Sequence, residues 1–109
     1  MINRGNWILF KKYLVYRQEV DQVSPKTLRN EETWLTHVLA WADETPFQNV
    51  PKIRPIFPQY LLTVGFEDQH DQLSSAYTKK IIRAAHRFFR WLSAHQRGYK
   101  GLNAEYLDT

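Results

Sequence analysis

Basic side chains recur at helical spacing near the end of the sequence. At about 100° per residue, a helix over residues 75–97 gathers five fixed cations and one histidine on one side: Lys79, Arg83, His86, Arg87, Arg90 and Arg97. No Asp or Glu lies four residues away to pair with them, so the cations repel one another. A phosphate backbone would relieve this repulsion and release counterions. The pattern predicts an anion-binding face, with a solvated polar face as the alternative.

The charge of the whole chain is distributed unevenly. Its 109 residues include 15 Lys and Arg against 11 Asp and Glu, which gives a net charge of +4. Residues 72–104 hold seven of the basic residues and no acid, so the rest of the chain carries −3. Such asymmetry indicates a nucleic acid or another anionic surface as the partner.

A second helix, expected over residues 25–43, shows a weaker version of the same pattern. Opposite its leucines lies a face of short polar and basic residues: Lys26, Arg29, Asn30, Thr33, Thr36 and His37. Glu31 and Glu32 lie off that face. These residue types suit phosphate oxygens and base edges, although an ordinary exposed face is the alternative. Side by side, the two helices would present one basic groove.

Catalytic and metal-binding patterns are missing from the sequence. It has no Cys, and its four histidines lack the spacing of metal ligands. We expect Asp68, His70 and Asp71 to form a solvated acidic loop rather than a metal or proton-transfer site. No serine has a credible base, and no glycine-rich loop could cradle a phosphate. The chain is therefore expected to bind no cofactor and to catalyse no reaction.

The elements that must position these residues are helices. Hydrophobic spacing predicts four of them, over residues 5–21, 25–43, 57–64 and 75–97. Ser24 and Pro25 mark a helix start, while Gly65 and Gly98 are expected helix ends. No strand pattern of convincing length appears. The predicted fold is all-α, a compact bundle of four to five helices.

The connections and the core follow from the remaining residues. Three prolines predict an irregular connection over residues 45–55, and an acidic loop is expected over 66–72. Four Trp, six Tyr and six Phe predict a core built on aromatic side chains. Trp34 and Trp41 share one side of their helix, which favours core or partner packing over base stacking. In the first helix, the inward stripe is expected at Phe10, Tyr13, Leu14, Arg17 and Val20.

Membrane and secreted classes are disfavoured. The unbroken apolar runs are far shorter than the roughly 20 residues of a membrane span. The start of the chain also lacks the apolar stretch of a signal peptide. A cytoplasmic protein of a reducing compartment is expected.

Three segments together resemble a known family. The first is Ser24-Pro25-Lys26-Thr27-Leu28, followed by Leu35, Val38 and Trp41. The second is Pro58-Gln59-Tyr60-Leu61-Leu62, and the third is residues 73–92, which begin Leu73-Ser74-Ser75 and end Phe88-Phe89-Arg90-Trp91-Leu92. Their order and spacing over residues 7–98 are similar to the N-terminal SAM-like, core-binding domain of phage integrases and other tyrosine recombinases.

The resemblance implies a SAM-like orthogonal helical bundle that binds double-stranded DNA. In that family the domain clamps one face of the recombination site, and the catalytic domain of the same chain clamps the other. The resemblance implies that the second and last helices face the DNA. The DNA-binding residues that it implies are Lys26, Arg29, Asn30, Thr33, Lys79, Arg83, Arg87 and Arg90. The expected domain spans residues 1–98, with 99–109 as a linker toward an absent catalytic domain.

Two departures from the family shape the expectation. Glu31 stands where many relatives have an aromatic residue, so a different core is expected there. The Arg, His-x-x-Arg and Tyr of the catalytic domain have no room in this chain, which predicts a fragment or a stand-alone domain without enzyme activity. The alternative function is a helical protein-interaction module that mediates recombinase assembly without DNA affinity. Its surface anchors would be Trp7, Trp34 or Trp41.

Overall fold

The computed structural model describes residues 1–68, 75–96 and 99. This part of the chain consists, in order, of α1 (Arg4–Glu19), α2 (Pro25–Ala42), the 3₁₀ helix η1 (Phe47–Lys52), α3 (Phe57–Asp68) and α4 (Ser75–His95), with no strand. The predicted all-α class is confirmed.

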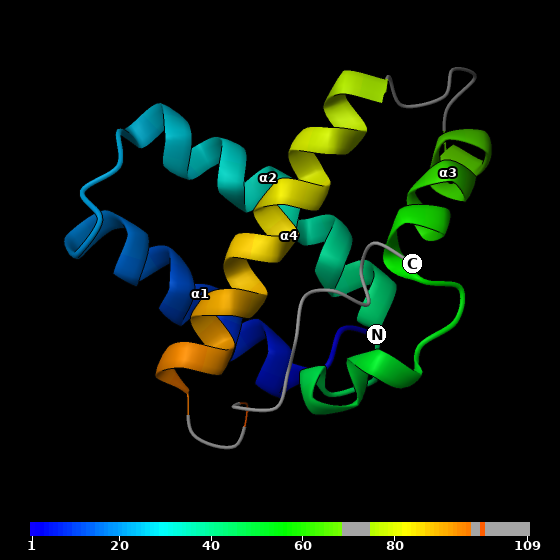
Figure 1. Cartoon of the computed structure of the whole chain (residues 1–109), viewed down its shortest axis with the longest axis horizontal. Helices are drawn as coiled ribbons and strands as arrows, with labels where there is room; N and C mark the ends of the chain where they lie inside the picture. Colours follow the sequence, from blue (N-terminus) through cyan, green and yellow to red (C-terminus); the bar gives the residue numbers. More distant parts are fainter. Residues whose placement is uncertain (69–74, 97–98, 100–109) are drawn as a thin grey trace.

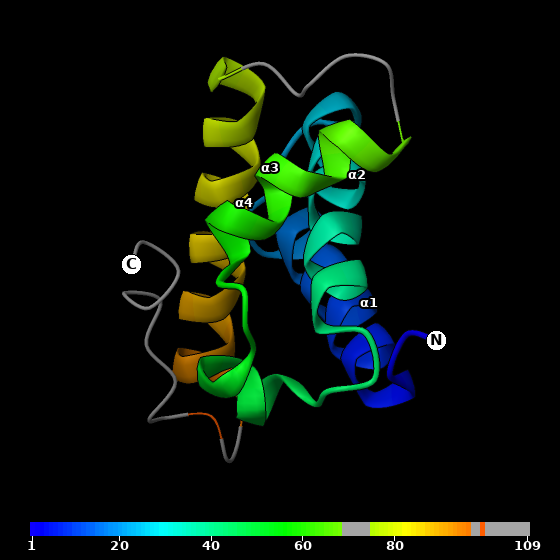
Figure 2. The ribbon, with the colours of Figure 1, turned by 90° about the vertical axis from the view of Figure 1, so that its right-hand side faces the viewer.

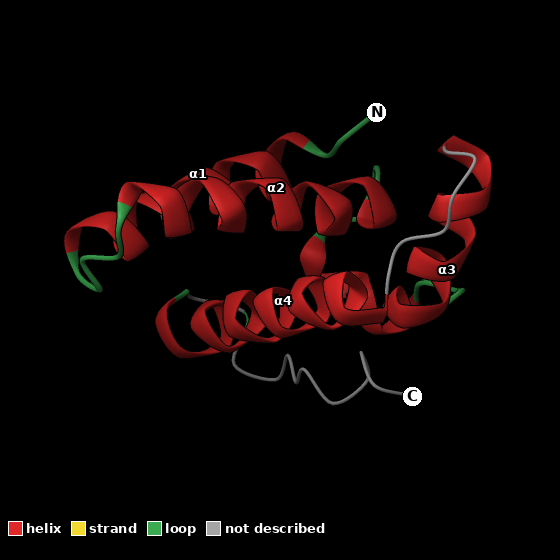
Figure 3. Cartoon of the chain, turned by 90° about the horizontal axis from the view of Figure 1, so that it is seen from above, coloured by secondary structure: helices red, strands yellow, loops and turns green. Residues whose placement is uncertain are grey.

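α1 and α2 run side by side in opposite directions, and α4 crosses them (Figure 1). Seen from above, the helices form two layers, with α1 and α2 in one and α4 in the other, and α3 beside α4 (Figure 3). The side view shows α4 on one flank of the molecule and α1 and α2 on the other (Figure 2). Because α2 contacts each of the other three α-helices, it is the central element that fixes their relative positions.

The starts of the first two helices follow from capping side chains. Ser24 Oγ accepts a 3.1 Å hydrogen bond from the Thr27 N–H, and Pro25 occupies the first turn, where no donor is needed. The Asn3 side chain caps α1 in the same way, accepting from the Asn6 N–H at 3.0 Å. The predicted start of the second helix is therefore confirmed.

The core between the layers is aromatic, as the composition predicts. Phe88 of α4 lies 5.2 Å from Tyr13 of α1 and 5.3 Å from Phe47 of η1, measured between ring centroids in edge-on arrangements. Trp41 of α2 packs on Phe57 of α3 at 5.3 Å. Ring contacts of this kind stabilise a core beyond the area that they bury. One set of these rings links α1, η1 and α4, and the other links α2 to α3.

One buried polar side chain, Asn6, ties α1 to the chain that follows α2. Its Nδ2 donates to the Thr45 carbonyl oxygen at 2.8 Å, and its Oδ1 accepts from the Phe47 N–H at 3.0 Å. Burial of an amide is tolerated because both ends are hydrogen-bonded. Sequence reasoning missed this contact because its partners are backbone groups about 40 residues away.

Several predicted boundaries are wrong. α3 continues through Gly65 to Asp68, so residues 66–68 are helical rather than part of a loop. A glycine inside a helix costs only about 1 kcal/mol and does not force a stop. Residues 47–52 form η1 because Phe47 and Val50, three apart, are both buried. Val20 lies beyond the end of α1 and is 62% exposed, not inward-facing.

The other predictions about connections concern residues that lie mostly outside the described ranges. These are the rest of the acidic loop with His70 and Asp71, the end of the last helix at Arg97 and Gly98, and the linker over 100–109. Tyr99, the first residue of the expected linker, is half-buried and packs against the core.

Candidate nucleic-acid interface

α4 separates its side chains into an inner and an outer face. Its inner face is fully buried and apolar: Ile81, Ala84, Ala85, Phe88, Phe89, Trp91 and Leu92. Lys79, Lys80, Arg83 and Arg90 are exposed, and His86 and Arg87 are half-buried. The predicted separation into an apolar and a basic face is confirmed for the described residues. Arg97 lies outside them.

Among the described residues, no acid forms an ion pair with Lys79, Lys80, Arg83 or Arg90. α4 also begins at Ser75 without an acidic residue in its first turn. The four cations thus repel one another within four turns of a single helix, a cost that an anionic ligand would remove. We call these four residues the α4 cations.

The polar face of α2 is also exposed, except at His37, which is half-buried. Lys26, Arg29, Asn30 and Thr33 are all exposed, and Thr33 Oγ1 donates to the Arg29 carbonyl oxygen at 3.1 Å. The hydroxyl oxygen keeps its acceptor capacity, and the lysine, arginine and amide groups remain in solvent. The side chains expected to contact DNA from α2 are therefore accessible.

A shallow hollow of about 160 Å³ lies at the junction of the two basic faces, between α2 and α4. Trp34 of α2 and Lys80, Arg83 and Arg87 of α4 line it. Because Trp34 follows Thr33 and stands one turn after Asn30, the hollow lies where the two faces adjoin. Here the ring of an α2 tryptophan lies beside three basic side chains of α4.

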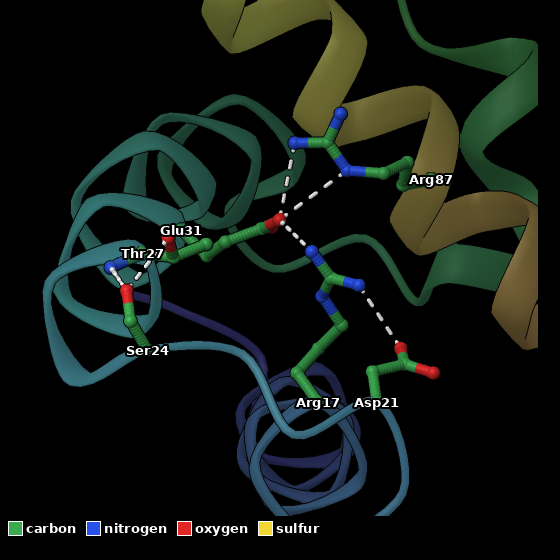
Figure 4. A network of polar contacts seen from close by, with 6 residues as sticks. All are labelled: Arg17, Asp21, Ser24, Thr27, Glu31 and Arg87. Atoms are coloured by element: carbon green, nitrogen blue, oxygen red, sulfur yellow. Dashed lines mark hydrogen bonds and ion pairs between the residues drawn. The ribbon is translucent and has the colours of Figure 1, made fainter.

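The contact that holds this junction is an ion cluster around Glu31 (Figure 4). The Glu31 side chain is completely buried, and its Oε1 accepts from Arg17 Nη2 at 2.9 Å and from Arg87 Nη2 at 3.0 Å. Arg87 Nε adds a third bond at 3.2 Å, and Arg17 Nη1 pairs with Asp21 at 3.0 Å. One carboxylate thus joins α1, α2 and α4.

The Glu31 cluster corrects one expectation. Arg87 is not an unpaired cation, because packing brings Glu31 of α2 to it even though no acid lies four residues away in α4. With 39% of its side chain exposed, Arg87 still reaches the surface, but Glu31 fixes the direction of its guanidinium.

The hydroxyl of Tyr13 belongs to the same cluster. Burial, together with the nearby Glu31 carboxylate, raises the pKa of Tyr13 to about 12 although Arg17 and Arg87 oppose the rise. Burial lowers the pKa of Arg17, but the hydrogen bond to Asp21 and the interactions with Tyr13 and Glu31 together outweigh that effect and leave the pKa raised. At neutral pH the cluster therefore holds a neutral phenol beside two charged guanidinium groups.

Of the eight predicted DNA-binding residues, seven are exposed and one, Arg87, is half-buried in an ion cluster. Sequence reasoning missed Glu31 as the partner of that residue, and Arg17 as the second cation on the same carboxylate. One signal was available, because Arg17 falls on the inward stripe of α1, where a charged group needs a partner. The sequence could not indicate which acid supplies it.

Other kinds of site find no support in the described part of the chain. No three His, Asp or Glu side chains there gather in a group that could hold a metal ion. None of the helices described has the length and apolar content of a membrane span.

No protein family matches the chain, and no curated protein or solved structure is similar enough to count as a match. The class that fold and surface define is an all-α bundle with a basic face formed by α2 and α4. Its function has to be argued from that surface.

Proposed function

We propose that this chain is the DNA-binding domain of a tyrosine recombinase of the phage integrase type, which clamps the recombination core site through α2 and α4. The α4 cations carry the proposal, because they are exposed, lie on one helix face and have no acidic partner among the described residues. In this role the domain itself performs no chemistry. Its partners would be duplex DNA, the catalytic domain of the same parent chain and further recombinase copies on the DNA.

Contacts to phosphate would supply most of the affinity. Each phosphate that a cation neutralises releases condensed counterions, so affinity falls steeply as the salt concentration rises. Asn30 and Thr33 present the amide and hydroxyl groups that read base edges or anchor phosphates. A half clamp of this kind is expected to bind weakly without its catalytic domain, and to gain specificity when the whole protein closes around the site.

Charge reversal tests the proposal directly. We expect the chain to bind a fluorescently labelled duplex, with anisotropy titrations showing much weaker binding at about 200 mM than at about 50 mM salt. The double variant Arg83→Glu/Arg90→Glu should weaken binding by at least tenfold at the lower salt. Lys12→Glu/Lys52→Glu, the same charge change at exposed residues of α1 and η1, is the matched control. Equal affinity of the two double variants would sink the proposal.

The outer face of α1 favours a second candidate, a protein-interaction module. Trp7, Ile8 and Val15 are between 42% and 51% exposed and, with Lys11 and Lys12, line a hollow of about 420 Å³. Exposed tryptophans of this kind commonly anchor protein contacts. Trp41 cannot serve as a surface anchor, since it is buried and donates its indole N–H to the Pro55 carbonyl oxygen at 2.9 Å. Concentration-dependent sedimentation without any DNA affinity would select this candidate.

A further inference from the structure

A second hollow beside α4 differs in its lining from the hollow beside Trp34. It measures about 310 Å³ and lies between the C-terminal halves of α1 and α4. This volume is at the lower end of the range typical of small-molecule sites, about 300 to 1,000 Å³. The hollow is therefore large enough for one planar ring with a substituent, and too small for a folded peptide or a helix.

Aromatic rings form the wall of this hollow. Tyr16 of α1 lies 6.0 Å from Trp91 and 5.1 Å from His95, both of α4, between ring centroids. Trp91 is buried, and its indole N–H has no hydrogen-bond partner in the described structure. A buried donor without an acceptor is rare in native proteins. A hollow lined by aromatic rings suits a flat, stacking ligand.

Charged side chains also line this hollow: three arginines, and Asp21, whose carboxylate pairs with Arg17 at 3.0 Å. Arg90 is exposed and has no acidic partner among the described residues, whereas Arg17 and Arg87 are held in place by Glu31. Two of the three arginines are therefore oriented by the protein, and the third is available for an anion. A ring-lined hollow with an available guanidinium in its lining selects a ligand that joins a planar base to a phosphate.

We propose that this hollow binds one unpaired nucleotide, with the base against Tyr16, Trp91 and His95 and the phosphate on Arg90. The inference deepens the proposed function and rests on it, since Arg90 also belongs to the α4 cations and DNA on that face brings its phosphates to this side chain. The nucleotide could come from a DNA strand or from free solution. Both sources share the same chemistry, and the two kinds of probe below separate them.

The test blocks the hollow without changing its charge. Ala94 lines it and is exposed, so Ala94→Phe fills the space and keeps every arginine. Ala40→Phe, at an exposed alanine of α2 outside the lining of the hollow, is the matched control. The probes are a blunt duplex, the same duplex with one unpaired adenine nucleotide, and deoxyadenosine monophosphate followed by tryptophan fluorescence.

We expect the parent chain and Ala40→Phe to bind the bulged duplex about tenfold more tightly than the blunt one, the gain of one stacked base. Ala94→Phe should keep the blunt-duplex affinity and lose that gain, and His95→Ala should lose part of it. Fluorescence quenching by the monophosphate that disappears in Ala94→Phe would place a free nucleotide in the same hollow.

Two results overturn the proposal. One is equal affinity of the parent chain for the bulged and blunt duplexes together with no quenching by the monophosphate. The other is a preference for the bulge that survives in Ala94→Phe. Failure of the proposed function can be distinguished from failure of this proposal. If the proposed function fails, neither duplex binds, and fluorescence quenching by the monophosphate still tests the hollow by itself.

Discussion

At the scale of single residues, Glu31 has the largest structural role among the charged groups. Its carboxylate is completely buried and forms ion pairs with two guanidinium groups, one from α1 and one from α4. Replacing a buried ion pair by apolar residues is often harmless, but removing one partner leaves an uncompensated charge. The cluster thus stabilises the native packing chiefly because each of its charged groups would be costly to bury without the others.

Glu31→Gln should therefore destabilise the fold by about 2 kcal/mol, below the 3–5 kcal/mol of a fully buried pair, because Arg17 keeps Asp21 and Arg87 reaches solvent. The neighbouring Glu32→Gln removes the same charge from an exposed position and should change stability by less than about 0.5 kcal/mol. Urea unfolding of both variants measures the difference. Equal midpoints and slopes would show that the cluster contributes nothing to stability.

The raised pKa of Tyr13 predicts that the fold loses stability at alkaline pH. The folded chain holds the phenolic proton up to a pKa of about 12, whereas a tyrosine in the unfolded chain titrates near pH 10. The stabilisation is complete below pH 10 and is lost as the pH rises toward 12, because only the unfolded chain releases its proton in that window. The loss should amount to about 1 to 2 kcal/mol.

The variant Tyr13→Phe isolates this effect. At pH 8 this variant should be less stable than the parent chain, because it lacks the hydroxyl. Between pH 10 and 12 the difference in unfolding free energy between the two proteins should shrink, because only the parent chain loses the stabilisation by Tyr13. Urea titrations of both proteins across that range provide the comparison. A deficit that stays constant over the window would mean that the Tyr13 hydroxyl titrates as in the unfolded chain.

At the scale of elements, local patterns in the sequence predict much of what the structure shows. The apolar and basic faces of α4 are correct because a single helix sets both by periodicity alone. The start of α2 at Ser24 and Pro25 is also a local matter of capping. The exposure of Lys26 and Arg29 follows from the same helical projection.

Features set by tertiary contacts could not be predicted in this way. Arg87 and Glu31 are 56 residues apart, and no local rule pairs them. Gly65 weakens an isolated helix, but α3 continues through it, and the apolar side chains of α3, such as the fully buried Phe57 and Leu61, are held in the core. The hollow between α1 and α4 likewise depends on how two distant helices cross.

At the scale of the whole molecule, the proposed functions meet at Arg87. This residue lines both the hollow beside Trp34 and the hollow beside Tyr16. Because Glu31 holds the Arg87 guanidinium by hydrogen bonds, it also fixes the side chain that the two hollows share. α2, in contact with every other α-helix, carries Glu31 on its inner side and the polar face on its outer side. One helix therefore sets both the packing and the shape of the proposed DNA surface.

If α2 and α4 contact the same duplex, their phosphate contacts should add in the salt dependence of binding. Each lost contact reduces the slope of log affinity against log salt by about 0.9. Arg29→Ala on α2 and Arg83→Ala on α4 should each lower the slope by about one, and the double variant by about two. Anisotropy titrations at four or five salt concentrations measure these slopes, with Lys12→Ala as the control. A slope that responds to Arg83→Ala but not to Arg29→Ala would restrict the interface to α4, and the two faces would then not form one groove.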